Sequence, residues 1–511
     1  MRPFTVLALL FALTAGPALA APGLVRVETG DLRGASADGV LSFKAIPYAA
    51  PPVGRLRWRM PRPPAPWDGV RDATAFGPAC LQAPVLGESY PVPGPYSEDC
   101  LTLNVWAPAE PDRPLPVIVW IHGGGFTNGG AASRAFDGAA LAGQGAVLVS
   151  LNYRLGRFGF FAHPALTAEA TGEARGNYGL ADQIAALQWV RRNIAAFGGD
   201  PGNVTLMGES SGGLAVAALM TSPAAEGLFH KAIIQSAGGR QPLPALTGPS
   251  LDGGRSMEAI GAAFAGHRRT ARQLRRLSGR RVLAGRNMVD NIERRTAVNL
   301  MVDGTLLPGD PLTLFEQGRQ ARVPLLIGAN SDELTPVFGA VSGLAMAQFG
   351  PRAAALRQAW RPPGGPDQTH RFVSDLLAVE PARRMATLAA RTGQPVFLYR
   401  FGYVAQKERR PGRGAAHASE IPYVFDNPSG LRRPTDPDRA MASAVSAAWV
   451  RFARTGDPSG PGGWDWPRYD ETRPVLVIGE TGPRLVHDPD GERLDLIESL
   501  YPTTIWTWPR Q

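Results

Sequence analysis

The segment Gly208-Glu-Ser-Ser-Gly-Gly213 contains the residues whose types and spacing point most directly to chemistry. An apolar, β-branched run at 204–207 precedes it and a second apolar run at 214–220 follows it, which predicts a buried strand and then a helix. Glycines on both sides of Ser210 allow the backbone to reverse sharply, so that the hydroxyl projects from the edge of a sheet. The N–H groups at the start of the helix favour an oxyanion there. The segment predicts a nucleophilic serine; the alternative is a plain Gly/Ser turn.

A serine hydroxyl needs a base that takes its proton and an acid that orients the base. His417 has the most suitable context for the base, because it lies in a loop after a predicted strand at 396–401 and before an apolar turn. The acid is expected at a strand end between serine and histidine in the chain, where Asp332 and Glu333 are adjacent. Neighbouring residues at a strand end point to opposite sides, so only one of the two carboxylates reaches His417. The residues alone do not choose between them.

Backbone donors for an oxyanion are expected at His122-Gly-Gly-Gly125, which follows an apolar run at 116–121. The amides of Gly124 and Gly125 have no Cβ beside them that would block close approach, and the amide of Ser211 adds a third donor. Losing one such donor typically costs ~3 kcal/mol of transition-state stabilisation. We expect His122 to contribute to this loop through its backbone and not through its imidazole ring. Surface or structural roles are predicted for the other histidines, which are His163, His230, His267, His370 and His487.

Glycine-rich loops also bind phosphate, but the sequence has no Gly-x-x-x-x-Gly-Lys-Ser/Thr motif and no Gly-x-Gly-x-x-Gly after a strand. It has no His-Glu-x-x-His motif and no Cys/His cluster that would indicate a metal site. We therefore expect neither a cofactor nor a metal.

The net charge of +9 does not predict a nucleic-acid-binding protein. Only three lysines occur, Lys44, Lys231 and Lys407, and every other basic residue is an arginine, which is a compositional bias rather than a phosphate-binding face. One cluster of arginines at helical spacing predicts a solvated helix face. The alternative is that it attracts anionic substrates toward a cleft. The cluster consists of Arg268, Arg269, Arg272, Arg275, Arg276, Arg280 and Arg281.

The segments that contain the candidate site residues follow fully apolar runs, and these runs alternate with amphipathic helices. This pattern predicts an α/β protein with a large, mostly parallel sheet covered on both faces. Functional groups gather at the carboxyl ends of the strands in such sheets, and both Ser210 and the glycine loop fall there. Helices are expected at 178–197, ended by Gly198-Gly-Asp-Pro201, and at roughly 440–455. Strands are expected at 116–121, 146–151, 204–207, 232–235, 323–327, 396–399 and 475–478.

The first twenty residues resemble a secretory signal peptide. Arg2 gives a positive start, the apolar run at 4–13 is too short to span a bilayer, and Ala18-Leu-Ala20 is a small-x-small cleavage signal before Ala21. The sequence thus predicts a secreted or periplasmic protein with a single catalytic domain at 21–511, and no membrane association after cleavage. A retained anchor is the weaker alternative, because no second apolar stretch of spanning length follows.

Cys80 and Cys100 are the only cysteines. An exported protein meets an oxidising compartment, so we expect these two residues to form one disulfide that closes a surface loop. The chain-entropy model gives roughly 3 kcal/mol for a loop of this size.

These motifs, in this order, resemble the type-B carboxylesterases, the cholinesterase-like branch of the α/β-hydrolase fold, over nearly the whole chain after residue 20. The resemblance implies that Ser210 is the nucleophile, Glu333 the acid and His417 the base. It also implies that the disulfide lies beside an active-site gorge, and that Glu209 and Ser236 surround the triad. Other matching strings are Phe43-Lys-Ala-Ile-Pro-Tyr48, Ser97-Glu-Asp-Cys100, Asn152-Tyr-Arg-Leu-Gly156, Asn177-Tyr-Gly-Leu-Ala-Asp-Gln183, Val302-Asp-Gly304 and Gly414-Ala-Ala-His417.

Two departures from the family pattern concern the site. Ser211 replaces the usual alanine after the nucleophile, which matters little if only its amide acts. The loop between the cysteines has Tyr90 and Tyr96 but no tryptophan, so the cation–π contact to a choline group is missing and choline esters are not expected.

The sequence therefore predicts a serine hydrolase of small-molecule carboxylic esters that needs no nucleic acid and no obligatory protein partner. A non-catalytic adhesion or binding protein on the same scaffold is the alternative from another class. Within the hydrolases the alternatives are a lipase that acts on long acyl chains and a dedicated esterase of one polyester toxin or drug-like compound, and thioesterase, amidase and transferase are alternative side activities. The stretches 84–96, 240–300 and 335–372 are expected to line the entrance and to set the substrate.

Overall fold

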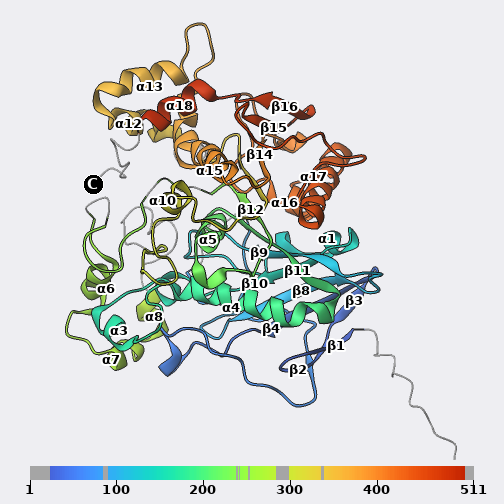
Figure 1. Ribbon diagram of the computed structural model, residues 1–511, viewed down its shortest axis with the longest axis vertical. Coiled ribbons are helices and arrows are strands. Elements are labelled where there is room, and N and C mark those ends of the chain that lie inside the picture. Colours follow the sequence, from blue (N-terminus) through green and yellow to red (C-terminus); the bar gives the residue numbers. More distant parts are fainter. Residues whose placement is uncertain are drawn as a thin grey trace, which may run out of the picture.

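The computed structural model describes residues 23–83, 90–237, 240, 242–250, 254–283, 298–334 and 339–500. Residues 1–20, predicted as a signal peptide, lie outside this part. An eleven-stranded sheet forms its centre (Figure 1). In spatial order the strands are β16 (Gly482–His487), β15 (Pro474–Gly479), β14 (Val396–Phe401), β13 (Leu325–Asn330), β12 (Lys231–Gln235), β11 (Gly199–Glu209), β9 (Leu115–Ile121), β10 (Val147–Leu151), β8 (Thr102–Pro108), β4 (Val40–Pro47) and β3 (Ala35–Ala37).

Neighbouring strands are parallel from β15 to β10 and antiparallel at both edges of the sheet. The predicted α/β class with a mostly parallel sheet is confirmed. All residues of β9 are buried, because a strand covered on both faces has to be apolar throughout. The sequence did not predict β4 and β8, in which Lys44 and Asn104 interrupt the apolar pattern.

Side chains of β9 alternate between two hydrophobic cores, one on each face of the sheet. Val117 and Val119 pack in the first core, and Ile118 and Trp120 pack in the second. Helices close both cores, as burial of a parallel sheet requires. The first core contains residues of α4 (Tyr178–Asn193), α5 (Ser211–Met220) and α15 (Glu380–Ala390), and the second contains residues of α1 (Ala139–Gly143), α16 (Ile421–Val424) and α17 (Asp436–Thr455).

The predicted helix at 178–197 consists of α4 and a following 3₁₀ turn, Ile194–Phe197. Gly198 ends it with a φ of 78°, a conformation that favours glycine. β11 begins at Gly199, earlier than the predicted strand at 204–207. Gly199 pairs with Leu115 and Val204 with Val117, so residues 200–203 form an irregularity inside the strand rather than a free loop.

The late helix α17 begins at Asp436, not near residue 440. Thr435 and Asp438 form a capping box there, in which each side chain accepts a hydrogen bond from the other residue's backbone N–H. Pro437 fits the first turn, where its missing N–H costs nothing. Gly456, in a left-handed conformation, ends the helix as predicted.

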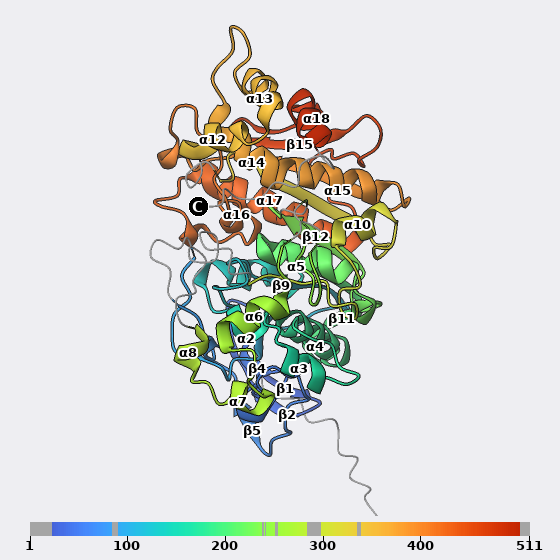
Figure 2. The same ribbon diagram turned by 90° about the vertical axis from the view of Figure 1, so that its left-hand side faces the viewer.

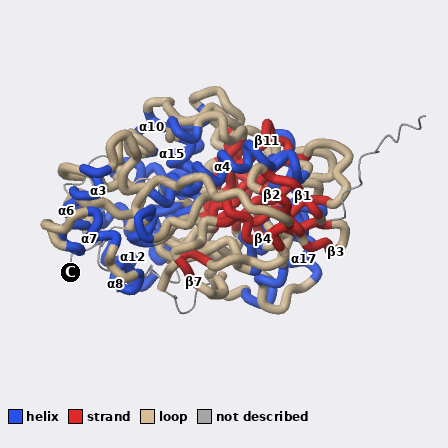
Figure 3. The backbone as a smooth tube through the Cα atoms, turned by 90° about the horizontal axis from the view of Figure 1, so that it is seen from below, coloured by secondary structure: helices blue, strands red, loops and turns tan. Residues whose placement is uncertain are grey.

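Smaller elements surround the sheet (Figure 2). From below, β1, β2, β3 and β4 lie apart from α3, α6, α7, α8 and α12 (Figure 3). None of the described helices is long and apolar enough to cross a membrane. Two further sheets are β1 (Leu24–Val27), β2 (Gly30–Arg33) and β5 (Val70–Asp72), and β6 (Ala79–Cys80) with β7 (Tyr96–Ser97). The remaining helices are α2 (Gly156–Gly159), α3 (Pro164–Glu169), α6 (Met257–Ala265), α7 (Ala271–Arg275), α8 (Gly279–Leu283), α10 (Pro311–Glu316), α12 (Ser342–Ala347), α13 (Ala353–Trp360), α14 (Phe372–Ser374) and α18 (Gly491–Leu500).

The predicted disulfide between Cys80 and Cys100 is present. Just after Cys80, the side chain of Gln82 exchanges two hydrogen bonds with the backbone of Gly129, at 2.7 and 2.9 Å. Gly129 follows the glycine-rich segment at 122–125, so the cross-linked loop holds that segment in place.

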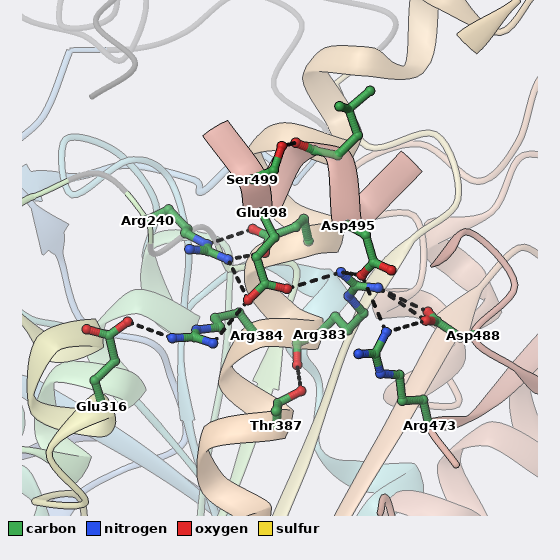
Figure 4. A network of polar contacts seen from close by, with 12 residues as sticks. Arg240, Glu316, Arg383, Arg384, Thr387, Arg473, Asp488, Asp495, Glu498 and Ser499 are labelled. Carbon is green, nitrogen blue, oxygen red and sulfur yellow. Dashed lines mark hydrogen bonds and ion pairs between the residues drawn. The ribbon is translucent and has the colours of Figure 1, made fainter. Parts of the chain in front are cut away.

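Ion pairs fasten the C-terminal helix α18 to α15 (Figure 4). Arg383, which is 4 % exposed, lies 2.7 Å from Asp495 and 3.4 Å from Glu498. Arg384 joins Glu498, at 3.0 Å, to Glu316 of α10, at 2.9 Å. Partly exposed pairs of this kind contribute modestly one by one and more as a network. The end of the described chain is thus held by ion pairs as well as by its buried side chains Leu494, Ile497 and Leu500.

Candidate active site

A sharp turn between β11 and α5 presents Ser210. Its φ of 56° and ψ of −125° are strained for a residue with a Cβ. The glycines around it leave no room for a side chain: a Cβ on Gly208 would lie 2.5 Å from Gly212 C, and one on Gly212 would lie 2.1 Å from Ile121 O. The strand–turn–helix that the sequence predicted around the serine is therefore present, and its glycines are required sterically.

Ser210, His417 and Glu333 form a continuous hydrogen-bonded chain. Ser210 Oγ lies 3.0 Å from His417 Nε2, and His417 Nδ1 lies 2.6 Å from Glu333 Oε2. The other oxygen of Glu333 accepts a hydrogen bond from the backbone N–H of Asn330, at 2.7 Å. Glu333 follows β13 and His417 follows β14, two adjacent parallel strands, so the sheet brings together residues that are far apart in the chain.

Asp332, the second acid candidate, faces away from this chain. Its Oδ2 accepts a hydrogen bond from the backbone N–H of Gly414, at 3.3 Å. The backbones of residues 331–333 and 414–417 also pair, with Asp332 N–H bonded to Ala415 O at 2.9 Å and His417 N–H bonded to Glu333 O at 3.0 Å. The structure separates the two adjacent carboxylates, and Glu333 is the one that contacts the histidine.

Backbone N–H groups of the glycine loop and of α5 lie close to the serine. A Cβ on Gly123 would lie 3.1 Å from Ser210 Cβ, and one on Gly124, whose φ is 108°, would lie 2.2 Å from Asn128 O. Within the described part of the chain, the amides of Gly124, Gly125 and Ser211 donate no hydrogen bond, so they remain available to an oxyanion. The hydroxyl of Ser211 accepts the N–H of Phe126 at 3.2 Å, an arrangement that alanine could not provide.

Glu209 is a second buried carboxylate beside the imidazole, with Oε1 at 3.3 Å from His417 Nε2. Burial raises the pKa of Glu209 to about 8. Burial lowers the pKa of His417, but the charges of Glu209 and Glu333 outweigh that effect and raise it. The pKa of each group therefore depends on the charge of the other.

A cavity of about 310 Å³, called the serine cavity here, opens beside Ser210 and His417. Ser236 lines it with a φ of 51° and a buried hydroxyl that has no hydrogen-bond partner among the described residues. Of the stretches expected at the entrance, only 240–300 contributes to the described lining, and none of the clustered arginines does. Its walls are Gly125, Phe126, Ser210, Ser211, Leu214, Ser236, Val298, Asn299, Glu333, Leu334, Leu377, Ala378 and His417.

His122 has a structural place, in line with its prediction. Burial lowers the pKa of its ring to about 4, and the ring stacks on Tyr153 at 4.5 Å between centroids. The hydroxyl of Tyr153 donates to the carbonyl of His122 at 2.9 Å. These contacts fix the start of the glycine loop.

The sequence prediction missed a buried polar group behind His417. Glu420 is fully buried, and its oxygens accept hydrogen bonds from Gln235 at 3.1 Å and Asn330 at 2.6 Å. Asn330 also donates to Ala416 O at 2.7 Å. These bonds brace the turn of Glu333 against the loop of His417. The signal in the sequence that could have indicated Glu420 is a carboxylate three residues after His417 and directly before an apolar run.

A mostly parallel sheet with a strained serine at the end of one strand, and a histidine and an acid after two others, defines an α/β-hydrolase with a serine-centred site. The sequence profile described as "Carboxylesterase family" matches residues 21–343 and 365–496. The chain belongs to this family and is a carboxylic ester hydrolase.

Relatives that are named as esterases align with this chain over nearly its whole length. The chain is 37% identical to the para-nitrobenzyl esterase of Bacillus subtilis (strain 168) over 500 residues, covering 94% of this chain and 99% of the relative. It is 37% identical to the fumonisin B1 esterase of Sphingopyxis macrogoltabida over 483 residues, covering 90% and 87%. A solved structure of a PNB esterase superposes with a TM-score of 0.80 at 34% identity, covering 93% and 99%.

Proposed function

We propose that Ser210, His417 and Glu333 are the catalytic triad, and that ester hydrolysis proceeds through an acyl-enzyme on Ser210. The observation that carries this assignment is the hydrogen-bonded chain from Ser210 Oγ through the imidazole to a buried carboxylate. In the first step Ser210 Oγ bonds to the ester carbonyl carbon while its proton passes to His417 Nε2. The C–O bond to the alcohol then breaks, and His417 returns that proton to the departing oxygen.

In the second step a water molecule gives a proton to His417 as its oxygen bonds to the acyl carbon. The bond to Ser210 Oγ breaks, the serine regains its proton from His417 and the carboxylic acid leaves. We assign the oxyanion of both tetrahedral intermediates to the amides of Gly124, Gly125 and Ser211. Support comes from the lack of other hydrogen bonds at these amides within the described chain.

The substrates we propose are small, uncharged esters. Apart from the triad groups, the serine cavity is lined by apolar and neutral side chains such as Phe126, Leu214 and Leu377, and a charged acyl group would lose hydration there without gaining a partner. Para-nitrobenzyl esters, after which one relative is named, are a suitable first substrate. A panel of esters that vary in acyl length and alcohol size would measure which substrates the enzyme prefers.

We further propose that the chain is exported, with cleavage between Ala20 and Ala21, and that residues 21–511 act as one catalytic domain that needs no obligatory protein or nucleic-acid partner. The disulfide supports an oxidising compartment. N-terminal sequencing of protein recovered from the periplasm and the medium tests both the cleavage site and the location. Recovery in the cytoplasm with Met1 retained would contradict the proposal.

The decisive test compares the Ser210→Ala variant with the parent on a para-nitrobenzyl ester. Loss of a triad nucleophile lowers kcat by about 10⁴-fold or more. Ser278→Ala, at an exposed position, serves as the matched control. Labelling with an organophosphate and peptide mapping should place the adduct on Ser210; an adduct on another serine, or parental turnover by Ser210→Ala, would refute the assignment.

A further inference from the structure

A second cavity, of about 520 Å³, adjoins the loop of His417 and shares no lining residue with the serine cavity. We call it the arginine cavity. Its volume is in the range of small-molecule sites. Its lining combines residues 403–405 and 407–410 after β14, residues 414–416 and 419 of the His417 loop, Tyr423 of α16, and residues 431–433 before α17.

Basic side chains dominate the lining: five are cationic and only Glu408 is anionic. Arg409 is paired with Glu480 at 3.2 Å, and Glu408 accepts the backbone N–H of Arg432 at 3.2 Å. Asp438 lies behind the wall, where it accepts the hydroxyl of Tyr403 at 2.9 Å. Four cations form no ion pair and no side-chain hydrogen bond within the described chain: Lys407, Arg410, Arg432 and Arg433.

Two tyrosines form the inner wall of the arginine cavity. Their rings, of Tyr403 and Tyr423, meet edge to face with centroids 5.4 Å apart. Tyr423 is 1 % exposed, and its hydroxyl has no hydrogen-bond partner among the described residues. Buried hydroxyls are nearly always paired, so the hydroxyl of Tyr423 is left as an unused hydrogen-bond donor at the wall of the cavity.

We propose that the arginine cavity binds a small organic polyanion, with its charges on Lys407, Arg410, Arg432 and Arg433 and its carbon body against the tyrosine wall. Arginine forks match both carboxylate and phosphate oxygens. The aromatic wall favours an anion with a carbon skeleton over a bare inorganic one. This site is independent of the proposed catalytic function.

The arginine cavity is placed to influence the serine cavity through the segment 414–417. Residues 414–416 line it, while Gly414 N–H is bonded to Asp332 and Ala415 N–H to Ser331 Oγ at 2.9 Å. His417 is the next residue along this paired segment. A polyanion that steadies the segment steadies the imidazole, so we expect it to raise kcat and leave KM unchanged.

The test is calorimetric titration of the full protein with citrate at fixed ionic strength, together with ester kinetics. Glycerol 2-phosphate in a second arm separates organic phosphates from carboxylates as the preferred source of charge, and inorganic phosphate in a third arm tests for the carbon body. We expect citrate or glycerol 2-phosphate to bind more tightly than inorganic phosphate. Equal binding of all three, or no binding, would overturn the proposal.

Two pairs of variants locate the bound anion. Arg410→Ala/Arg432→Ala/Arg433→Ala should weaken citrate binding by about tenfold, since exposed charge contacts are individually modest. The control is Arg268→Ala/Arg269→Ala/Arg272→Ala, which removes the same charge from exposed positions elsewhere. Tyr423→Phe should weaken citrate binding roughly threefold. Its control is Tyr399→Phe, which removes another buried, unpaired hydroxyl outside this cavity.

If each control loses as much affinity as its partner variant, the anion is not in the arginine cavity and the proposal fails. A citrate effect on KM alone, with kcat unchanged, would place citrate in the serine cavity and overturn it equally. Binding to the parent that is lost in the cavity variants and kept in the controls supports the proposal, whatever the outcome of the Ser210→Ala test.

Discussion

The two cavities beside the His417 loop place their charges differently. At the serine cavity, the carboxylate of Glu333 in its wall and that of Glu209 behind it are buried within reach of the imidazole. In the arginine cavity, Arg432 and Arg433 are exposed at the rim. A buried charge is costly and acts strongly on its neighbours, whereas an exposed one is cheap and screened by solvent. The buried carboxylates therefore control the protonation of His417, whereas the exposed arginines of the arginine cavity suit the binding of a dissolved anion.

The largest expected effect follows from removing the imidazole on the loop that both cavities adjoin. His417→Ala should lower kcat by about 10⁴-fold or more, because the serine loses its base. His267→Ala, at an exposed position, should stay close to the parent in the same ester assay. A His417→Ala variant with more than a tenth of parental kcat would show that His417 is not the base, and that the buried carboxylates beside it do not direct the chemistry.

The adjacent acids allow a sharper comparison. Glu333→Gln should lower kcat by about 10³- to 10⁴-fold, because the amide no longer stabilises the imidazolium. Asp332→Asn removes the same charge one residue away, where the carboxylate contacts the Gly414 N–H and Arg413 but not the imidazole, and should stay within about tenfold. Steady-state kinetics on both variants decide the point, and equal losses would contradict the assignment of the acid.

The glycine loop predicts a smaller but still large effect. Gly124→Ala should lower kcat by about 10²-fold, because the Cβ would displace Asn128 and with it the backbone donors. Gly412→Ala is the control: Gly412 also has a positive φ, of 71°, but a Cβ there would meet nothing within 4 Å. Comparable losses of kcat in the two variants would mean that backbone strain, not donor position, is responsible.

The smallest predicted effect is a shift in pH dependence. His417 must be neutral to act as a base, so activity falls as the pH drops through its pKa. Glu209 is the charged neighbour that raises this pKa most, and Glu209→Gln should therefore move the acid limb of the kcat/KM profile to lower pH. An acid limb that stays in place or moves upward would show that the Glu209 charge does not act on the imidazole.

Sequence patterns predicted the elements that are buried on both sides. The strands β9 and β11, and the turn that presents Ser210, follow from apolar runs and from glycines that steric contact requires. Asp332 and Glu333 could not be told apart by pattern, because the choice depends on how the turn after β13 faces the His417 loop. The resemblance favoured Glu333, and Glu333 is the carboxylate that contacts His417 in the structure.

Other features depend on contacts that no local pattern reveals. The helix α17 begins at Asp436, before the apolar positions that predict a helix from about residue 440, because Thr435 and Asp438 form a capping box there. The arginine cavity is assembled from residues 403–405, 407–410 and 431–433, which are ordinary polar stretches until the fold brings them together. Glu420 was passed over for the same reason, since its burial comes from strands elsewhere in the chain.

The attachment of α18 has a consequence for how the molecule would come apart. Leu494, Ile497 and Leu500 of that helix are buried, and its ion pairs to Arg383 and Arg384 run through Asp495 and Glu498, whose side chains are 56 % and 38 % exposed. Salt screens exposed charges far more than buried ones. At high salt concentration we therefore expect helix α18 to detach before the sheet unfolds and to become the first site of protease cleavage.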